Sequence, residues 1–173
     1  MAKIKASLIA GKITSNSVEA QDLIASKNFG EKLGQKIFYS LPEALFLVED
    51  KKMEVFDHRE NLVSSSNLQK KFQRLDKNFL NKFVVYRDLR KKGYVVKTAL
   101  KFGAEFRVYE KGKSSGKNHS KWILFPVSEY EGCSWQDFSA KNRVAHSSKK
   151  NILVAIVDEE TRVSYYEVKW IKL

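Results

Sequence analysis

Short apolar stretches separated by polar turns run along the first third of the chain. The first of these stretches, residues 4–9, predicts a strand. Three further segments follow: a strand or short helix over 17–27, a glycine-containing loop over 28–35, and a strand over 52–57. This pattern predicts a small mixed fold of strands and helices.

Helix-start signals occur twice in this region. The run Ser40-Leu-Pro-Glu43 matches a capping box, in which the serine hydroxyl faces free backbone N–H groups and the glutamate reaches back. The helix that it opens is expected to continue through Val48. Farther along, Ser64-Ser65-Ser66 indicates a helix start or a linker, and a helix is expected over 68–75.

The pattern changes near residue 78. Residues 78–92 predict a helix, because its last turn is basic and Gly93 follows, as helix C-termini favour. Beyond it lie β-branched and aromatic runs that predict strands, over 94–98, 105–110, 122–127, 152–158 and 163–172. Residues 151–158 are almost entirely apolar, which is typical of a central strand covered on both faces.

One more helix is expected between the third and fourth of these strands. It opens with the capping-box-like run Ser134-Trp-Gln-Asp137 and turns Phe138, Val144 and Ala145 inward. The fold class is therefore α+β, with a domain boundary near residue 78. A small N-terminal α+β domain over 1–77 would serve assembly and support. The domain over 78–173 would be α/β-like and nuclease-like, a mixed central sheet flanked by helices.

Charge distinguishes the two predicted domains. Lys and Arg outnumber Asp and Glu by 32 to 20, a formal net charge of +12. Residues 79–173 hold 19 basic and 10 acidic side chains, so most of the excess lies in the C-terminal domain. A concentrated positive field attracts polyanions, of which nucleic acid is the most common, although a solvated basic surface has the same composition.

Composition and motifs exclude several classes of protein. No apolar run reaches eighteen residues, so no membrane-spanning helix is expected, and the N-terminus has no signal-peptide pattern. The single cysteine, Cys133, cannot form an internal disulfide, which fits a reducing cytoplasm or nucleus, and a cytoplasmic location is expected. One Cys and three scattered His offer no zinc spacing, and phosphate-binding glycine loops are absent, so no metal or cofactor is expected.

Three residues at the ends of basic strands remain as candidates for chemistry: Tyr109, His119 and Lys150. Each also has an ordinary structural explanation. Tyr109 would serve as a half-buried core aromatic, His119 as a surface histidine, and Lys150 as a cation that complements a helix dipole. Spacing alone does not select these three residues.

Taken together, the three side chains suit metal-independent cleavage of RNA, which carries its own nucleophile in the 2′-hydroxyl. A histidine transfers protons near neutral pH. Cations near a phenol lower its pKa, so that more of it is ionised and able to accept a proton. A lysine stabilises the negative charge that develops on the phosphorane. This set would supply a base, an acid and a fixed positive charge.

Several runs occur in an order and at a spacing that are highly specific in combination. They are Tyr86-Arg-Asp-Leu-Arg-Lys-Lys-Gly-Tyr94, Val95-Val-Lys-Thr98, Lys101-Phe-Gly-Ala-Glu-Phe-Arg-Val-Tyr109, His119-Ser120, Arg143-Val-Ala-His-Ser-Ser-Lys-Lys150, Ile156-Val-Asp158 and Tyr165-Tyr166. With them, residues 85–166, about half of the chain, closely resemble the archaeal tRNA-splicing endonucleases and the catalytic subunits of their eukaryotic relatives. Ser40–Leu47 resembles the family's N-domain helix.

The resemblance implies a role for each candidate. Tyr109 matches the proposed general base, His119 the general acid, and Lys150 the lysine that stabilises the transition state. It also implies that the chain excises introns from precursor tRNA by cutting both splice sites in a bulge–helix–bulge motif. Cleavage without metal would leave a 2′,3′-cyclic phosphate and a 5′-hydroxyl.

The same resemblance implies how the substrate is bound and how the subunits assemble. Arg143 matches the arginine that clamps a flipped bulge base, and Trp170 falls near the second member of that clamp. The family works as a homotetramer or as a heterotetramer with a structural subunit. An acidic loop enters the neighbouring subunit, and here Glu129 and Glu131 would be its acids, although Tyr130 stands where an acid is expected.

Two alternatives remain open at this point. A metal-dependent nuclease would use carboxylates with a nearby lysine, and Asp158, Glu167 and Lys169 offer such a set. A non-catalytic RNA-binding or structural subunit of the same kind of complex would not need its three candidate side chains to converge.

Overall fold

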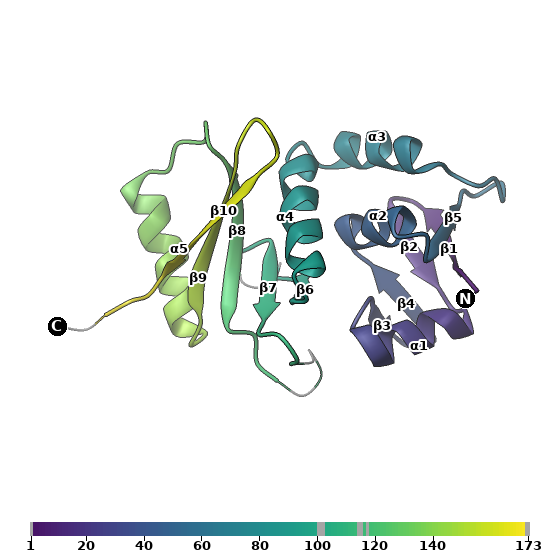
Figure 1. The fold of residues 1–173 in the computed structure, drawn as a ribbon, viewed down its shortest axis with the longest axis horizontal. Coiled ribbons are helices and arrows are strands. Elements are labelled where there is room, and N and C mark those ends of the chain that lie inside the picture. Colours follow the sequence, from purple (N-terminus) through teal and green to yellow (C-terminus); the bar gives the residue numbers. More distant parts are fainter. Residues whose placement is uncertain (1, 100–102, 114–115, 117, 172–173) are drawn as a thin grey trace. The chain divides into compact units, whose positions relative to one another are not determined.

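The computed structural model describes residues 2–99, 103–113, 116 and 118–171. The chain divides into two compact units, Met1–Phe83 and Val84–Leu173 (Figure 1). The cut falls inside helix α4 (Phe79–Lys91), a few residues beyond the expected boundary, so the division at residues 77 and 78 stays a prediction. Among the described residues, no helix is both long enough and apolar enough to cross a membrane.

Unit 1 is built on a five-stranded sheet in the order β3-β4-β2-β1-β5. Neighbouring strands are antiparallel except β1 and β5, which are parallel. The strands are β1 (Ile4–Ile9), β2 (Lys12–Ser15), β3 (Glu31–Leu33), β4 (Lys36–Tyr39) and β5 (Met53–Phe56). The helices are α1 (Val18–Lys27), α2 (Leu41–Glu49) and α3 (Ser65–Leu75). The core is formed by alternate strand residues such as Ile13 and Ile37 and by the apolar side of α2.

Two expectations for unit 1 change in detail. The ambiguous segment 17–27 is a helix, because the Ser17 hydroxyl accepts the Ala20 N–H (3.3 Å) and Asn28 ends the helix in the left-handed conformation. The expected loop over 28–35 contains β3, an edge strand whose side chains are all exposed. Its polar sequence has no hydrophobic alternation, so only its pairing with β4 reveals it.

The capping box predicted for α2 is wrong, although the helix begins where expected. Ser40 is the N-cap residue, but its side chain makes no capping hydrogen bond. Glu43 is buried and accepts the Gly30 N–H (2.9 Å) instead of reaching back to the start of its own helix. The carboxylate therefore joins α2 to the segment before β3.

Helices α3 and α4 follow the expected pattern closely. The Ser64 hydroxyl accepts the Asn67 N–H (3.3 Å) and caps α3. Phe72 of α3 packs edge-on against Phe79 at the start of α4, with ring centroids 5.3 Å apart. Gly93 has a φ of 89°, the left-handed conformation that a glycine after a helix adopts without strain.

Unit 2 is a mixed five-stranded sheet in the order β10-β9-β8-β7-β6. β8 and β9 are parallel and the other neighbours are antiparallel. The strands are β6 (Val95–Thr98), β7 (Phe106–Tyr109), β8 (Trp122–Ser128), β9 (Asn151–Val157) and β10 (Val163–Val168), with helix α5 (Trp135–Ser147) between β8 and β9. The α+β class and the mixed sheet are confirmed.

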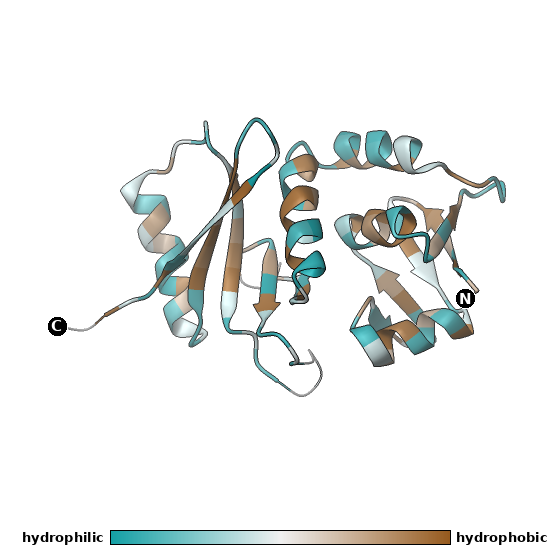
Figure 2. Cartoon of the chain, viewed as in Figure 1, coloured by the Kyte–Doolittle hydropathy of each residue, from teal (hydrophilic) through white to brown (hydrophobic). Residues whose placement is uncertain are grey.

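Helices cover both faces of this sheet (Figure 1). On one face, Ala145 of α5 joins a cluster with Ile123, Phe125 and Ile152. On the other face, Tyr86 of α4 contacts Phe106, with ring centroids 5.8 Å apart. In Figure 2 the central strands β8 and β9 are largely hydrophobic, whereas helices α4 and α5 carry both hydrophobic and hydrophilic residues.

The last strand is shorter than predicted. β10 ends at Val168, which pairs with Ile152 near the start of β9, so the residues after it have almost no strand left to pair with. Lys169–Ile171 are therefore not in a strand, and residue 172 lies outside the described part of the chain. The Lys101 and Phe102 portion of the family-like run also lies outside it.

The Tyr165 hydroxyl fastens β10 to α4, and its removal should weaken unit 2. It donates to Asp88 Oδ2 (2.7 Å), which also receives Lys92 Nζ (2.7 Å). Since a hydrogen bond to a charged group contributes about 1.5–3 kcal/mol, we expect Tyr165→Phe to lower the free energy of unfolding by about 1–2 kcal/mol. Urea unfolding measures the loss, and the exposed neighbour Tyr166→Phe is the matched control.

The same contact gives a pH dependence. Burial, and then the hydrogen bond to Asp88, raise the pKa of Tyr165 above its ordinary value. A raised folded-state pKa means that the stabilisation is complete below the unfolded pKa near 10 and is lost as pH rises beyond it. Tyr165→Phe should therefore lose less stability than the wild type above that pH, and equal losses would contradict this account.

Candidate active site

The sheet of unit 2 brings three chain segments to one of its ends. β7 finishes at Tyr109, while β8 and β9 begin at Trp122 and Asn151, and Trp122 pairs with both Val108 and Asn151. Just outside the strands, the Lys121 N–H donates to the Val108 carbonyl (3.0 Å) and the Lys121 carbonyl accepts the Asn151 N–H (3.1 Å). A continuous backbone ladder therefore holds this part of the molecule, which we call the Tyr109 end of the sheet.

The three candidates for catalysis all belong to segments that meet at the Tyr109 end. Tyr109 is the last residue of β7 and is buried, at 3% exposure. His119 is exposed, three residues before β8, and the buried Ser120 follows it. Lys150 directly precedes β9 and is half-buried. The sheet topology thus brings these three residues, which are far apart in the sequence, to one end of the sheet.

The Lys150 ammonium is anchored and lies near a second cation. Its Nζ donates to the Ser148 carbonyl (2.9 Å). Burial, and then the charge of Arg107, hold the pKa of Lys150 below its usual range. Arg107 stands two residues before Tyr109 on β7 and so faces the same side of the sheet, with its Nε bound to the Thr98 carbonyl (3.0 Å). Positive charge therefore gathers on the face that carries Tyr109.

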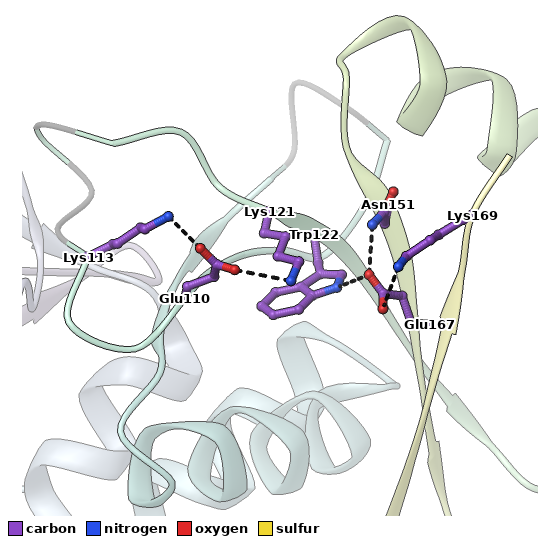
Figure 3. Close-up of polar contacts among 7 residues, drawn as sticks. All are labelled: Glu110, Lys113, Lys121, Trp122, Asn151, Glu167 and Lys169. Carbon is purple, nitrogen blue, oxygen red and sulfur yellow. Dashed lines mark hydrogen bonds and ion pairs between the residues drawn. The ribbon is translucent and has the colours of Figure 1, made fainter. Parts of the chain in front are cut away.

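A polar network that sequence reasoning missed borders the same end (Figure 3). Glu167 Oε1 on β10 accepts Trp122 Nε1 of β8 (2.9 Å) and Asn151 Nδ2 of β9 (2.7 Å), and Lys169 Nζ lies 3.5 Å from Oε2. Although burial acts to raise it, these donors leave the pKa of Glu167 below its ordinary value. One carboxylate thus ties together the ends of three strands.

A second carboxylate, Glu110, connects the chain on both sides of His119 (Figure 3). It directly follows Tyr109 and pairs with Lys113 and, at 3.1 Å, with Lys121. The hydrogen bonds from Lys113 and then Lys121 lower the pKa of Glu110. His119 stands between these two lysines in the sequence. Glu110 therefore binds one residue before His119 and one residue after it.

Arg143 and Trp170 line one surface pocket, together with Ser139, Asn142 and His146. Arg143 comes from α5 and Trp170 from the segment after β10. His146 packs edge-on against the Trp170 indole, with ring centroids 4.3 Å apart. We call this hollow the Arg143 pocket. Sequence reasoning missed His146, although its spacing of three from Arg143 on a helix was a usable signal.

The two acids expected at a subunit interface differ in their surroundings. Glu129 is already used within the chain, because its Oε1 accepts the Glu159 N–H in the turn between β9 and β10 (2.8 Å). Glu131 is exposed, and its backbone N–H donates to the Ser128 carbonyl (2.9 Å). Tyr130 between them is 73% exposed. Their interface role stays a prediction.

The carboxylates proposed for a metal-dependent nuclease do not come together. Asp158 follows β9 and is bound by Arg162 Nε (2.7 Å), whereas Glu167 pairs with Leu153. Leu153 and Asp158 are five residues apart along an extended chain, about 16 Å at 3.3 Å per residue. Among the described residues, no group of three or more His, Cys, Asp or Glu side chains is placed to hold a metal ion.

Comparison with known proteins gives family matches for both parts of the chain. Residues 79–165 match the family described as tRNA intron endonuclease, catalytic C-terminal domain, and residues 4–68 match the corresponding N-terminal domain. Proteins named tRNA-splicing endonuclease from Pyrococcus abyssi (strain GE5 / Orsay) and Thermococcus kodakarensis are each 43% identical over 150 residues, 87% of this chain and 85% and 87% of theirs. One from Nanoarchaeum equitans is 43% identical over 138 residues, 76% of this chain and 88% of its own length. The chain therefore belongs to the tRNA intron endonuclease family of enzymes.

Proposed function

We propose that this enzyme excises introns from precursor tRNA in the cytoplasm by cutting both splice sites of a bulge–helix–bulge motif, without metal. The products would carry a 2′,3′-cyclic phosphate and a 5′-hydroxyl. The observation that carries the proposal is the meeting of the Tyr109, His119 and Lys150 segments at the Tyr109 end of the sheet, in a chain of this family.

The proposed reaction uses only the substrate's own atoms and these three side chains. Tyr109 accepts the proton of the 2′-hydroxyl, whose oxygen attacks the adjacent phosphorus. The bond from phosphorus to the 5′-oxygen breaks, and His119 gives its proton to that oxygen. Lys150 stabilises the charge on the phosphorane, and its half-buried position strengthens the attraction, because the effective dielectric constant is lower than in water.

The Arg143 pocket is suited to hold an unpaired bulge base. A guanidinium and an indole are flat groups that stack on nucleobases, and each stacked base contributes about 1–3 kcal/mol. The edge contact from His146 supports the Trp170 ring, and Trp170 remains 57% exposed. Ser139 and Asn142 offer hydrogen-bonding groups at the same hollow.

Loss of either flat group should weaken RNA capture. We expect Arg143→Ala and Trp170→Ala each to reduce affinity for a bulge–helix–bulge RNA about tenfold, from roughly 1.4 kcal/mol of lost stacking. Lys141→Ala, a cation on the same helix that lies over the Phe125 ring, is the control for charge. Affinity measured by fluorescence anisotropy that stays at the wild-type value would remove these residues from the clamp.

Assembly is part of the proposal. Two bulges cut at a fixed separation call for two active sites related by two-fold symmetry. We expect four subunits, either four copies of this chain or two copies with two structural subunits, with Glu129 and Glu131 near a contact between them. Light scattering of the purified chain at micromolar concentration decides between the two compositions.

A pair of RNAs tests the substrate proposal. One is a short bulge–helix–bulge hairpin, and the other has the same sequence with both bulges closed by complementary nucleotides. We expect cleavage of the first RNA alone, because duplex RNA is recognised by shape and the unpaired nucleotides are what the pocket accepts. Equal cutting of both RNAs would contradict the bulge requirement.

A further inference from the structure

Helix α3 of unit 1 has one buried side and one basic side. Leu68 and Phe72 are fully buried. Lys70, Lys71 and Arg74 are exposed and lie within little more than one turn of each other. Figure 2 shows that most residues of α3 are hydrophilic. The buried pair fixes the orientation of the helix, so the three cations point to solvent together.

These cations line a hollow rather than a flat surface. The pocket lies between α3 and the segment after β5, and Asn67, Lys70, Lys71 and Arg74 form its helix side. Asp57 is on the other side, where it accepts the N–H groups of its own turn, from Arg59 (2.8 Å) and Asn61 (2.9 Å). Three positive charges against one carboxylate leave the lining with a net charge of +2.

The cations of this hollow have no ion-pair partner in the part of the chain that the structure describes. Elsewhere in unit 1, Lys82 pairs with Asp76 (2.7 Å) and Lys3 with Glu54 (2.7 Å). Lys70, Lys71 and Arg74 form no ion pair with any residue that the structure describes. They also fall between the two segments that match the family, 4–68 and 79–165.

We propose that this hollow, the α3 pocket, is a second RNA-binding site that takes backbone phosphates of the precursor tRNA away from the scissile bonds. Lys, Arg and Asn side chains are common donors to phosphate oxygens, and such contacts position a nucleic acid without reading its sequence. Three cations on adjacent helix positions match the closely spaced charges of a folded RNA. This proposal rests on the proposed function in one respect: the phosphates that the α3 pocket binds belong to the precursor tRNA that the enzyme is proposed to cut.

The test compares two variants of the full chain that lose the same charge. One carries Lys70→Ala, Lys71→Ala and Arg74→Ala, and the control carries Lys12→Ala, Lys32→Ala and Lys36→Ala, three exposed lysines on β2, β3 and β4. The probe is a tRNA transcript without an intron, which has phosphates but no splice site. Affinity is measured by fluorescence anisotropy between 50 and about 300 mM salt.

We expect the α3 variant to bind this tRNA about tenfold more weakly or worse, and to lower the slope of log Kd against log salt by about 2, since each phosphate contact contributes about 0.7–0.9. The control should keep nearly the full slope. Equal effects of both variants, or no effect of the α3 variant, would overturn the proposal. Arg74→Glu alone should reproduce the weakening if the triple variant is poorly folded.

Two further readouts separate this proposal from its alternatives. Cleavage of the short bulge–helix–bulge hairpin by the α3 variant should match the wild type, and a wild type that cuts no such RNA would instead disprove the proposed function. Loss of oligomers in the α3 variant with unchanged tRNA affinity would show that an acidic protein surface occupies the pocket, which would overturn the RNA assignment.

Discussion

Replacing His119 with alanine should reduce the rate of cleavage by about 10²–10⁴-fold while leaving affinity for the bulged RNA intact. This is the range that a positioned general acid contributes. The imidazole is exposed, whereas the next residue, Ser120, is buried, so the segment is anchored by its neighbour and not by the histidine itself. Single-turnover cleavage and anisotropy together measure the two quantities, with the exposed His58→Ala in unit 1 as the control.

A modified substrate makes this prediction specific to proton donation. If sulfur replaces the bridging 5′-oxygen, the leaving group is a thiolate that needs no acid, because its conjugate acid is far stronger than an alcohol. The His119→Ala enzyme should then cut at nearly the wild-type rate. A variant that remains inactive on this substrate, or that loses affinity or folded structure, would mean that His119 has a structural role.

Replacing Lys150 with alanine should lower the rate by about 10²–10³-fold on both the natural and the sulfur-containing substrate. Loss of a preorganised group that stabilises transition-state charge has this size. The ammonium donates to the Ser148 carbonyl, which holds it beside the start of β9 at the Tyr109 end of the sheet. Lys150→Arg should retain part of the activity, because the charge stays but the position changes. Lys141→Ala is the control, and a similar loss there would contradict a specific role.

The lowered pKa of Lys150 predicts how the cleavage rate of the wild type depends on pH, and Lys150→Arg tests that dependence. Only the protonated lysine stabilises the phosphorane, so activity falls as pH rises through its pKa, which burial and Arg107 place below the usual range for lysine. On the sulfur-containing substrate, where no acid is needed, this loss should be visible. The loss of activity at high pH should vanish in Lys150→Arg, since a guanidinium keeps its proton. The same loss of activity in both enzymes would mean that another group titrates.

The elements that local sequence patterns specify were predicted well. Runs rich in Val, Ile and aromatic residues became β8 and β9, and the Ser64 cap and Gly93 mark helix ends where expected. The predictions that failed concern contacts between residues that are distant in the sequence. β3 exists through its pairing with β4, and Glu43 binds the Gly30 amide rather than its own helix start. Such contacts have no local signature.

The candidate site likewise has features that the sequence indicates and features that only the folded structure shows. Residue types alone did not select Tyr109, His119 and Lys150, which a family resemblance supplied, but the strand register explains how their segments meet. Sequence reasoning considered Glu167 only as a carboxylate of a metal-dependent nuclease. Its hydrogen bonds to Trp122 and Asn151 could not be found from sequence, because these partners are 45 and 16 residues away along the chain. The α3 pocket likewise appears only when the helix packs beside the segment after β5.

One measurement tests the central claim most directly: incubation of the purified chain alone with a bulge–helix–bulge RNA in excess chelator, followed by end-group analysis. We expect cuts at both bulges, with 2′,3′-cyclic phosphate and 5′-hydroxyl ends and the same rate as with added Mg²⁺. Cleavage that requires the metal, or products with 3′-hydroxyl and 5′-phosphate ends, would contradict the proposed chemistry of Tyr109, His119 and Lys150.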